Sequence, residues 1–161
     1  MDNYHIMVVS PSDEFYINQC IEIARENHAM YGGFIPHLYA VKKSCDYIIC
    51  AVKGEEVLGY VGVNFNRLLN EYIVSQAAVK KIESGKGIGT KLMEYLVHHS
   101  SEVRKIISFV EKSNIPSNRM HLKAGFKCID EGYDYYYVIN TYQVKDNQKL
   151  KYYYFEAENE Y

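Results

Sequence analysis

Residues 84–90 read Ser-Gly-Lys-Gly-Ile-Gly-Thr and carry three glycines within five residues. An apolar segment, Tyr72 to Val79, precedes them, and Ile88, Leu92 and Leu96 then recur at the spacing of one helix face. A strand, a glycine turn and a helix start bring successive backbone N–H groups to one point, where the positive end of the helix dipole adds to them. Such turns bind phosphate groups, so we expect a ligand that carries a phosphate or pyrophosphate.

Spacing excludes two better-known glycine turns. A Walker loop requires Gly-x-x-x-x-Gly-Lys-Ser/Thr, and the position of its second glycine, counted from Gly85, is Thr90. A dinucleotide-binding turn requires Gly-x-Gly-x-x-Gly, and Thr90 again replaces the last glycine. An ordinary tight turn between a strand and a helix remains the simpler alternative.

A second segment of the sequence indicates which kind of phosphate-binding turn this is. Residues 114–126 read Asn-Ile-Pro-Ser-Asn-Arg-Met-His-Leu-Lys-Ala-Gly-Phe. Together the two segments resemble the GNAT superfamily of acyl-CoA-dependent N-acyltransferases, whose motifs run Arg/Gln-x-x-Gly-x-Gly/Ala and Asn-x-x-Ala/Ser-x-x-Leu-Tyr-x-x-x-Gly-Phe. The first motif matches from Ser84 to Gly89 with Ser for Arg/Gln; the second matches at Asn114, Ser117, Gly125 and Phe126, with Met120 for Leu and His121 for Tyr.

The resemblance implies an α/β fold in one domain over residues 1–161. Its central sheet is expected to be mixed and mostly antiparallel, with splayed fourth and fifth strands and flanking helices. Periodicity and turn residues place the elements independently. The expected strands are 6–9, 46–52, 57–65, 71–79, 106–110, 127–142 with a break near Gly132, and 150–157, and the expected helices run from caps at Ser12 or Asp13 to about Met30, then over 36–43, 88–99 and 114–123.

The resemblance also implies where acetyl-CoA, the co-substrate, binds. Two structural alternatives to these binding roles stay open. The Ala77-Ala78 pair is also typical of tight packing beneath a helix, and Asn114 is also a good N-cap. Ser84 lacks the long side chain that braces the loop in the family. The residues expected at the co-substrate are Ala77, Ala78 and Val79 along the pantetheine arm, Ser84, Gly85, Lys86, Gly87, Ile88, Gly89 and Thr90 at the pyrophosphate, and Asn114 and Ser117 opposite the arm.

Amine attack on a thioester requires that a proton leave the amine. Glu71 stands thirteen residues before Ser84, the interval at which histone-acetylating members carry their glutamate base. On a regularly alternating strand Glu71 would share a face with Ser75, Ala77 and Val79. A solvated carboxylate at a strand end is the alternative. The backbone N–H of Ser75 is expected to polarise the thioester carbonyl.

His121 is the largest departure from the family motif. The tyrosine usually found there protonates the leaving thiolate, and a histidine, with an ordinary pKa of about 6.5, can donate a proton in its place. The alternative is a partly exposed helix residue without a chemical role. Members that acetylate protein N-termini carry a glutamate five residues before the asparagine, whereas this chain has Phe109, which disfavours that activity.

Composition excludes several other classes. The 161 residues carry a formal net charge of -2 and no Lys/Arg run longer than two, which disfavours nucleic-acid binding. The four cysteines form no metal-binding or CxxC pattern, so we expect reduced thiols, no metal and a cytoplasmic location. Neither a signal peptide nor an apolar run of membrane-spanning length is evident.

The sequence therefore predicts an N-acetyltransferase that joins acetyl-CoA and a primary amine in a ternary complex. Whether the amine belongs to a small molecule or a protein stays open. The alternative function is a degenerate GNAT fold that binds CoA for regulation or scaffolding. Tyrosine runs at 135–137 and 152–154 favour a homodimer through the C-terminal strands, unless these tyrosines cover their own sheet.

Overall fold

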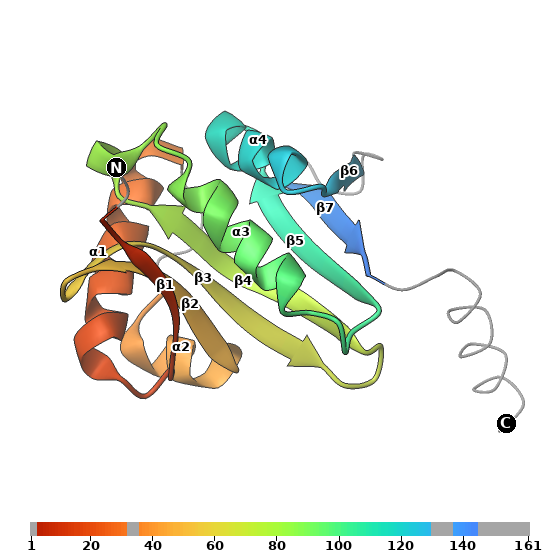
Figure 1. Ribbon diagram of the computed structural model, residues 1–161, viewed down its shortest axis with the longest axis horizontal. Helices are drawn as coiled ribbons and strands as arrows, with labels where there is room; N and C mark the ends of the chain where they lie inside the picture. Colours follow the sequence, from red (N-terminus) through yellow and green to blue (C-terminus); the bar gives the residue numbers. More distant parts are fainter. Residues whose placement is uncertain (1–2, 32–35, 130–136, 145–161) are drawn as a thin grey trace, which may run out of the picture.

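The computed structural model describes residues 3–31, 36–129 and 137–144 of the chain. These residues form one mixed sheet with helices on both faces (Figure 1). The elements are β1 (His5–Val9), α1 (Glu14–Tyr31), α2 (Leu38–Ser44), β2 (Tyr47–Lys53), β3 (Glu56–Asn66), β4 (Glu71–Val79), the 3-10 turn η1 (Lys81–Glu83), α3 (Ile88–His98), β5 (Lys105–Glu111), α4 (Ile115–Lys123), β6 (Lys127–Ile129) and β7 (Tyr137–Gln143).

The sheet has seven strands in the order β1-β2-β3-β4-β5-β7-β6. All neighbours are antiparallel except β4 and β5, which are parallel. This confirms the predicted mixed, mostly antiparallel sheet. The expected strand over 150–157, the break near Gly132 and the tyrosine run at 152–154 lie outside the described residues, and so do residues 135 and 136 of the other tyrosine run.

Two apolar cores lie on opposite faces of the sheet. On one face α1 and α2 cover the sheet, with Ile17 and Val41 fully or almost fully buried against β2 and β3. On the other face α3 packs through Leu92 and Leu96, whose four-residue spacing is the helical stripe expected from the sequence. Helix α4 lies beside α3 and contributes Met120 to the same core.

Strands β4 and β5 are paired along only part of their length. The pairs run from Glu71 and Lys105 to Val74 and Ser108 and then stop, although β4 continues to Val79 and β5 to Glu111. In Figure 1 the two strands move apart toward their carboxyl ends. The predicted splay is therefore confirmed. Beyond the last pair, the facing edges of β4 and β5 do not pair with each other.

A β-bulge interrupts β4 where the splay begins. Val74 is opposite Val63 and Gln76 is opposite Gly62, so Ser75 is an extra residue without a partner in β3. Val74, before the bulge, packs in the α3 core, and so do Ala77 and Val79 after it, at the opposite parity. The prediction that Glu71 shares a face with Ala77 and Val79 is wrong, because the extra residue reverses the alternation. Ser75 itself contacts Cys45 of the α1 core, on the face opposite Val74.

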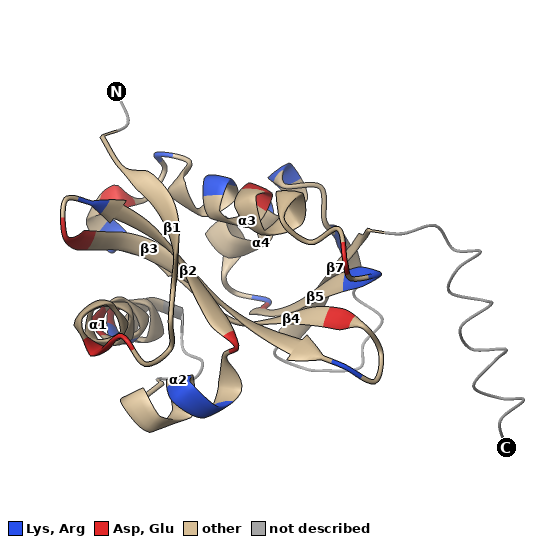
Figure 2. Cartoon of the chain, turned by 60° about the horizontal axis from the view of Figure 1, so that its bottom comes forward, with Lys and Arg blue, Asp and Glu red and all other residues tan. Residues whose placement is uncertain are grey.

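Figure 2 shows Lys and Arg interspersed with Asp and Glu rather than gathered on one face in that view. Within the described ranges, no helix is long and apolar enough to cross a membrane. Those same ranges contain no group of three or more His, Cys, Asp or Glu residues placed to hold a metal ion.

Candidate active site

Two adjoining cavities open where β4 and β5 separate. The first, of about 250 Å³, lies between these strands and reaches Ser108 and His121. The second, of about 390 Å³, follows β4 to the glycine turn and the start of α3. Because they share part of their lining, a ligand in one can meet a ligand in the other. The shared residues are Asn27, Tyr60, Ala77, Ala78, Asn114 and Ser117.

The glycine turn forms one end of the second cavity. Gly85 and Gly87 have φ values of +80° and +81°, a region that side chains with a Cβ rarely adopt. A Cβ at either position would meet no atom within 4 Å, so the turn is open on its outer side. Of the residues predicted at the pyrophosphate, the structure places Ser84, Gly85, Gly87, Ile88, Gly89 and Thr90 on the cavity wall.

Lys86 is absent from the lining of both cavities. Its ammonium instead forms a 2.9 Å ion pair with Glu83, and its side chain is 60% exposed. Glu83 does line the second cavity, so this pair partly offsets a carboxylate that would otherwise repel a phosphate. The direct contact predicted for Lys86 therefore stays a prediction that the geometry does not favour.

Gly89 has a packing role in addition to its place on the cavity wall. It is buried in the first turn of α3, and a Cβ there would overlap with Sδ of Met120. Glycine therefore lets α3 and α4 approach closely. The first four N–H groups of α3 have no acceptor inside the helix, and together with the dipole they make its N-terminus suited to an anion.

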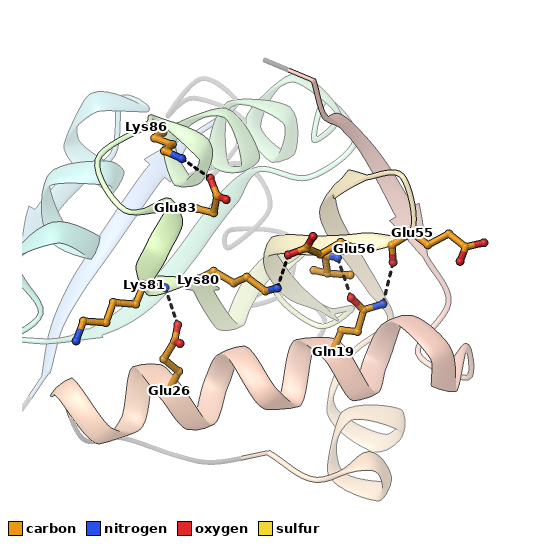
Figure 3. A network of polar contacts seen from close by, with 9 residues as sticks. Gln19, Glu26, Glu55, Glu56, Lys80, Lys81, Glu83 and Lys86 are labelled. Atoms are coloured by element: carbon orange, nitrogen blue, oxygen red, sulfur yellow. Dashed lines mark hydrogen bonds and ion pairs between the residues drawn. The ribbon is translucent and has the colours of Figure 1, made fainter. Parts of the chain in front are cut away.

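Polar contacts fix the glycine turn to the rest of the protein (Figure 3). The backbone N–H of Lys81 donates to Glu26 of α1 at 2.6 Å, just before the turn. The ammonium of Lys80 forms a 2.6 Å ion pair with Glu56 at the start of β3. Gln19 of α1 bonds the backbone of Val57 and Glu55 at 2.9 and 3.0 Å. The turn is thus held in place from both α1 and the β2–β3 hairpin.

Two cations on α4, Arg119 and Lys123, also line the second cavity. They stand four residues apart, so they project from one side of the helix. Neither was predicted from the sequence, although the i, i+4 spacing beside a glycine turn was the available signal. Their charges fit the phosphate groups expected at the turn.

The wall of β4 fits an extended polar arm. Ala77 and Ala78 line both cavities and Val79 lines the second, along the stretch where β4 no longer pairs with β5. Their N–H and C=O groups on that side are available to an amide-bearing chain in the manner of an added strand. The tight-packing alternative also holds in part, because Ala77 contacts the α3 core and Ala78 the α1 core.

Asn114 and Ser117 lie opposite β4, and both line the two cavities. The Asn114 side chain accepts a hydrogen bond from the Ser117 backbone N–H at 3.2 Å, which confirms the N-cap interpretation. Capping and a place beside the arm are therefore compatible.

Ser75 lies at the bulge and lines the first cavity. Its hydroxyl donates to the Gly62 carbonyl at 3.2 Å and lies 3.4 Å from Sγ of Cys45. These contacts tether the side chain to β3 and to Cys45 at the end of α2, whereas the bulge removes Ser75 from the β3–β4 ladder. The role of its backbone N–H as the oxyanion donor stays a prediction.

The environment of Glu71 fits neither the catalytic base nor the solvated strand-end carboxylate expected from the sequence. It is 2% exposed, so the solvated strand-end alternative is wrong. Its carboxylate pairs with Arg104 at 2.6 Å and with Lys105 at 3.5 Å. It lies in the paired part of β4, before the splay, and lines neither cavity. The geometry therefore gives Glu71 a structural ion pair and disfavours the role of base.

His121 is fully buried, so the exposed-residue alternative is wrong as well. Its Nδ1 lies 2.7 Å from the Ser117 carbonyl oxygen and its Nε2 lies 2.8 Å from Oγ of Ser108. Burial lowers the pKa of the imidazole below its ordinary value, against a smaller raising effect of the Ser117 carbonyl. A neutral imidazole cannot give a proton from both nitrogens, so His121 alone is a poor proton donor at neutral pH.

Comparison with known proteins shows the family of this chain and the proteins that share its fold. A family model, the acetyltransferase (GNAT) family, matches residues 16–126. An acetyltransferase of Thermus thermophilus is similar with a TM-score of 0.68 at 17% identity, covering 89% of this chain and 99% of its own. The ribosomal-protein-S5-alanine acetyltransferase of Vibrio fischeri gives 0.72 at 15% identity, covering 91% and 96%.

The protein yncA of Salmonella typhimurium, whose structure holds its cofactor acetyl-CoA, gives a TM-score of 0.68 at 16% identity and covers 89% of this chain and 95% of its own. No curated protein matches the sequence. The structural likenesses show a shared fold, and the family match extends over more than half of the chain. This protein therefore belongs to the acetyltransferase (GNAT) family.

Proposed function

We propose that this protein transfers an acetyl group from acetyl-CoA to a primary amine by direct attack in a ternary complex. The observation that carries the proposal is the junction of the two cavities at the unpaired edge of β4, next to the glycine turn. Acetyl-CoA in the second cavity and an amine in the first would meet at that junction. A chain that only bound CoA would have no need of the first cavity.

The residues present fit acetyl-CoA. The start of α3, with Arg119 and Lys123 beside it, suits the phosphates, and the edge at Ala77 and Ala78 suits the arm. Acetyl-CoA supplies a thioester whose carbonyl is open to nucleophiles. In this proposal the Ser75 backbone N–H faces the developing negative charge on that carbonyl oxygen.

The first cavity suits an amine that arrives as a cation. Glu111 provides a carboxylate on its wall, and Asn27, His28 and Gln76 provide further polar groups. We propose a primary amine of a small molecule or of a protein. The Vibrio fischeri neighbour is named for an alanine of ribosomal protein S5, but at 15% identity that substrate is not transferred to this chain.

Glu71 remains in the proposal only as a positioning residue. Its ion pair with Arg104 joins the start of β4 to the start of β5, just below the point where the strands separate. The alternative function is a CoA-binding module without turnover. The observation that favours it is that His121 is hydrogen-bonded at both ring nitrogens.

Two measurements decide between these functions. Acetyl-CoA should raise the melting temperature, because a ligand that binds only the folded protein stabilises it. CoA release should then be detected with at least one member of a panel of amines and lysine peptides. Binding without release across the panel would favour the non-catalytic module, and no binding of acetyl-CoA or CoA at millimolar concentration would refute both.

A further inference from the structure

A serine that the sequence motifs do not include lies at the apex of the splay. Ser108 is the last residue of β5 that is paired with β4, it is 1% exposed, and it lines the first cavity. Its hydroxyl lies 2.8 Å from Nε2 of His121. The two side chains come from β5 and α4, and only the packing of that helix on the sheet brings them together.

The hydrogen-bond partners assign the protons. The Ser117 carbonyl oxygen can only accept, so Nδ1 of His121 carries a hydrogen. Burial lowers the pKa of His121 and favours the neutral ring, whose other nitrogen then carries none. Nε2 therefore accepts, and the Ser108 hydroxyl donates its hydrogen to it. The result is a hydroxyl, an imidazole and an orienting acceptor in series.

We propose that Ser108 and His121, which line the first cavity, form a proton relay in which Ser108 is the catalytic residue and His121 acts through it. This inference rests on the proposed acetyl transfer. The Ser117 carbonyl fixes the ring, as the orienting third group does in other hydroxyl–imidazole sites. Because that group is a neutral carbonyl rather than a carboxylate, the relay suits removal of a proton from an amine better than full ionisation of the serine.

The proton balance is complete. An amine that arrives as a cation first releases one proton to the solvent. As the nitrogen of the neutral amine bonds to the thioester carbon, one of its protons passes to Oγ of Ser108, while the serine's own hydrogen passes to Nε2 of His121. As the carbon–sulfur bond breaks and its electron pair leaves with sulfur, the proton returns through Ser108 to that sulfur. An amide and the free thiol are formed, and both side chains regain their starting states.

The relay predicts the direction of the pH dependence. A protonated Nε2 cannot accept, so activity falls as pH falls through the pKa of His121. That pKa is lowered by burial. The low-pH limb of the activity profile, over which activity falls, therefore lies at a pH below the ordinary histidine pKa of about 6.5. The other titratable side chains that line the same cavity are His28 of α1, Tyr60 of β3, Glu111 of β5 and Tyr137 of β7.

The first test needs no co-substrate. Nitrogen-15 NMR of the histidine rings, with His121→Gln for assignment, should show a neutral ring protonated at Nδ1. Ser108→Ala should shift the Nε2 signal, because it removes the hydrogen bond to that nitrogen. Ser100→Ala is the control, since Ser100 is equally buried but bonds the Leu96 carbonyl. An Nε2 signal that Ser108→Ala leaves unchanged would overturn the relay.

The second test uses acetyl-CoA with hydroxylamine, an NH2-bearing nucleophile small enough for either cavity. Ser108→Ala should keep the acetyl-CoA-induced thermal shift but lower turnover about 10²-fold. Ser108→Thr, which keeps the hydroxyl, should retain most of it. Ser108→Ala/His121→Gln should be no slower than the slower single variant, because relay members act as a unit. Once the rates are divided by the fraction of hydroxylamine that is neutral at each pH, the low-pH limb should remain in the wild type and be absent from His121→Gln.

Three outcomes would overturn the relay while leaving acetyl-CoA binding intact. They are unchanged turnover in Ser108→Ala, an acetyl group found covalently on Ser108, and a wild-type protein that binds acetyl-CoA but does not acetylate hydroxylamine above the rate in buffer. Failure of the wild type to bind acetyl-CoA is a different result, and it would refute the proposed function itself.

Discussion

Two glycines with positive φ and different surroundings allow a matched test of the anion site. Gly87 lies at the start of α3 with φ +81°, and Gly54 lies in the β2–β3 turn with φ +63°. A Cβ added at either position would meet no atom within 4 Å. Glutamate at either position therefore meets the same backbone penalty of about 1–3 kcal/mol and adds the same charge. Of the two, Gly87 lines the second cavity and Gly54 does not.

The expected magnitudes follow from that comparison. Both Gly87→Glu and Gly54→Glu should lower the melting temperature, by about 2–4 °C for each kcal/mol lost. Acetyl-CoA at one hundred times its dissociation constant adds about 2.7 kcal/mol, which corresponds to a rise of about 5–11 °C. Gly54→Glu should keep this rise, whereas Gly87→Glu should lose it, because a carboxylate then occupies the place of the phosphates.

Differential scanning fluorimetry with and without acetyl-CoA measures both effects, and calorimetric titration gives the dissociation constants. The reasoning is refuted if Gly87→Glu keeps the wild-type rise, since the turn would then lie away from the ligand. It is refuted equally if Gly54→Glu loses the rise to the same extent, since strain rather than charge at the turn would then be responsible.

Three further predictions follow from the contacts of the site. Arg119→Ala/Lys123→Ala should weaken acetyl-CoA binding by at least about tenfold, more strongly at low salt, in titrations where Lys127→Ala on β6 is the control. Gly89→Ala should change the free energy of unfolding in urea by no more than about 1 kcal/mol, because the atom that its Cβ meets belongs to the flexible side chain of Met120 and alanine favours a helix over glycine. Glu71→Gln should cost about 3–5 kcal/mol because it removes one member of a buried ion pair; a wild-type denaturation midpoint would contradict this.

Local patterns in the sequence predicted where most helices and strands lie, and the family resemblance predicted how the strands form one sheet. The glycine turn, the stripe of Leu92 and Leu96 and the Asn114 cap each combine a local backbone requirement with a residue type that meets it. The cavity wall at Ala77 and Ala78 followed from the family resemblance. These features depend on residues close in the chain, so a single sequence carries them.

Features that depend on pairing between distant residues were not predicted. The bulge at Ser75 is one extra residue in an apolar strand and leaves no distinct pattern, although it reverses the face of every later side chain. The partner of Glu71 is Arg104, 33 residues away, and no local signal joins them. The sequence placed Lys86 at the ligand because it lies between the glycines, whereas its nearer partner is Glu83.

In the proposed relay, Ser108 and His121 together take the role of the tyrosine that the family motif carries at position 121. A tyrosine at this position would carry its hydroxyl at the far end of a six-membered ring, whereas the shorter imidazole ends at Nε2. Ser108 lies 2.8 Å beyond that nitrogen, so the pair restores a hydroxyl to the cavity and adds a base behind it. This hydroxyl lies where the β4–β5 pairing ends at Val74 and Ser108, one residue from the bulge. The end of the β4–β5 pairing thus places the buried hydroxyl that we propose moves the proton on the wall of the first cavity.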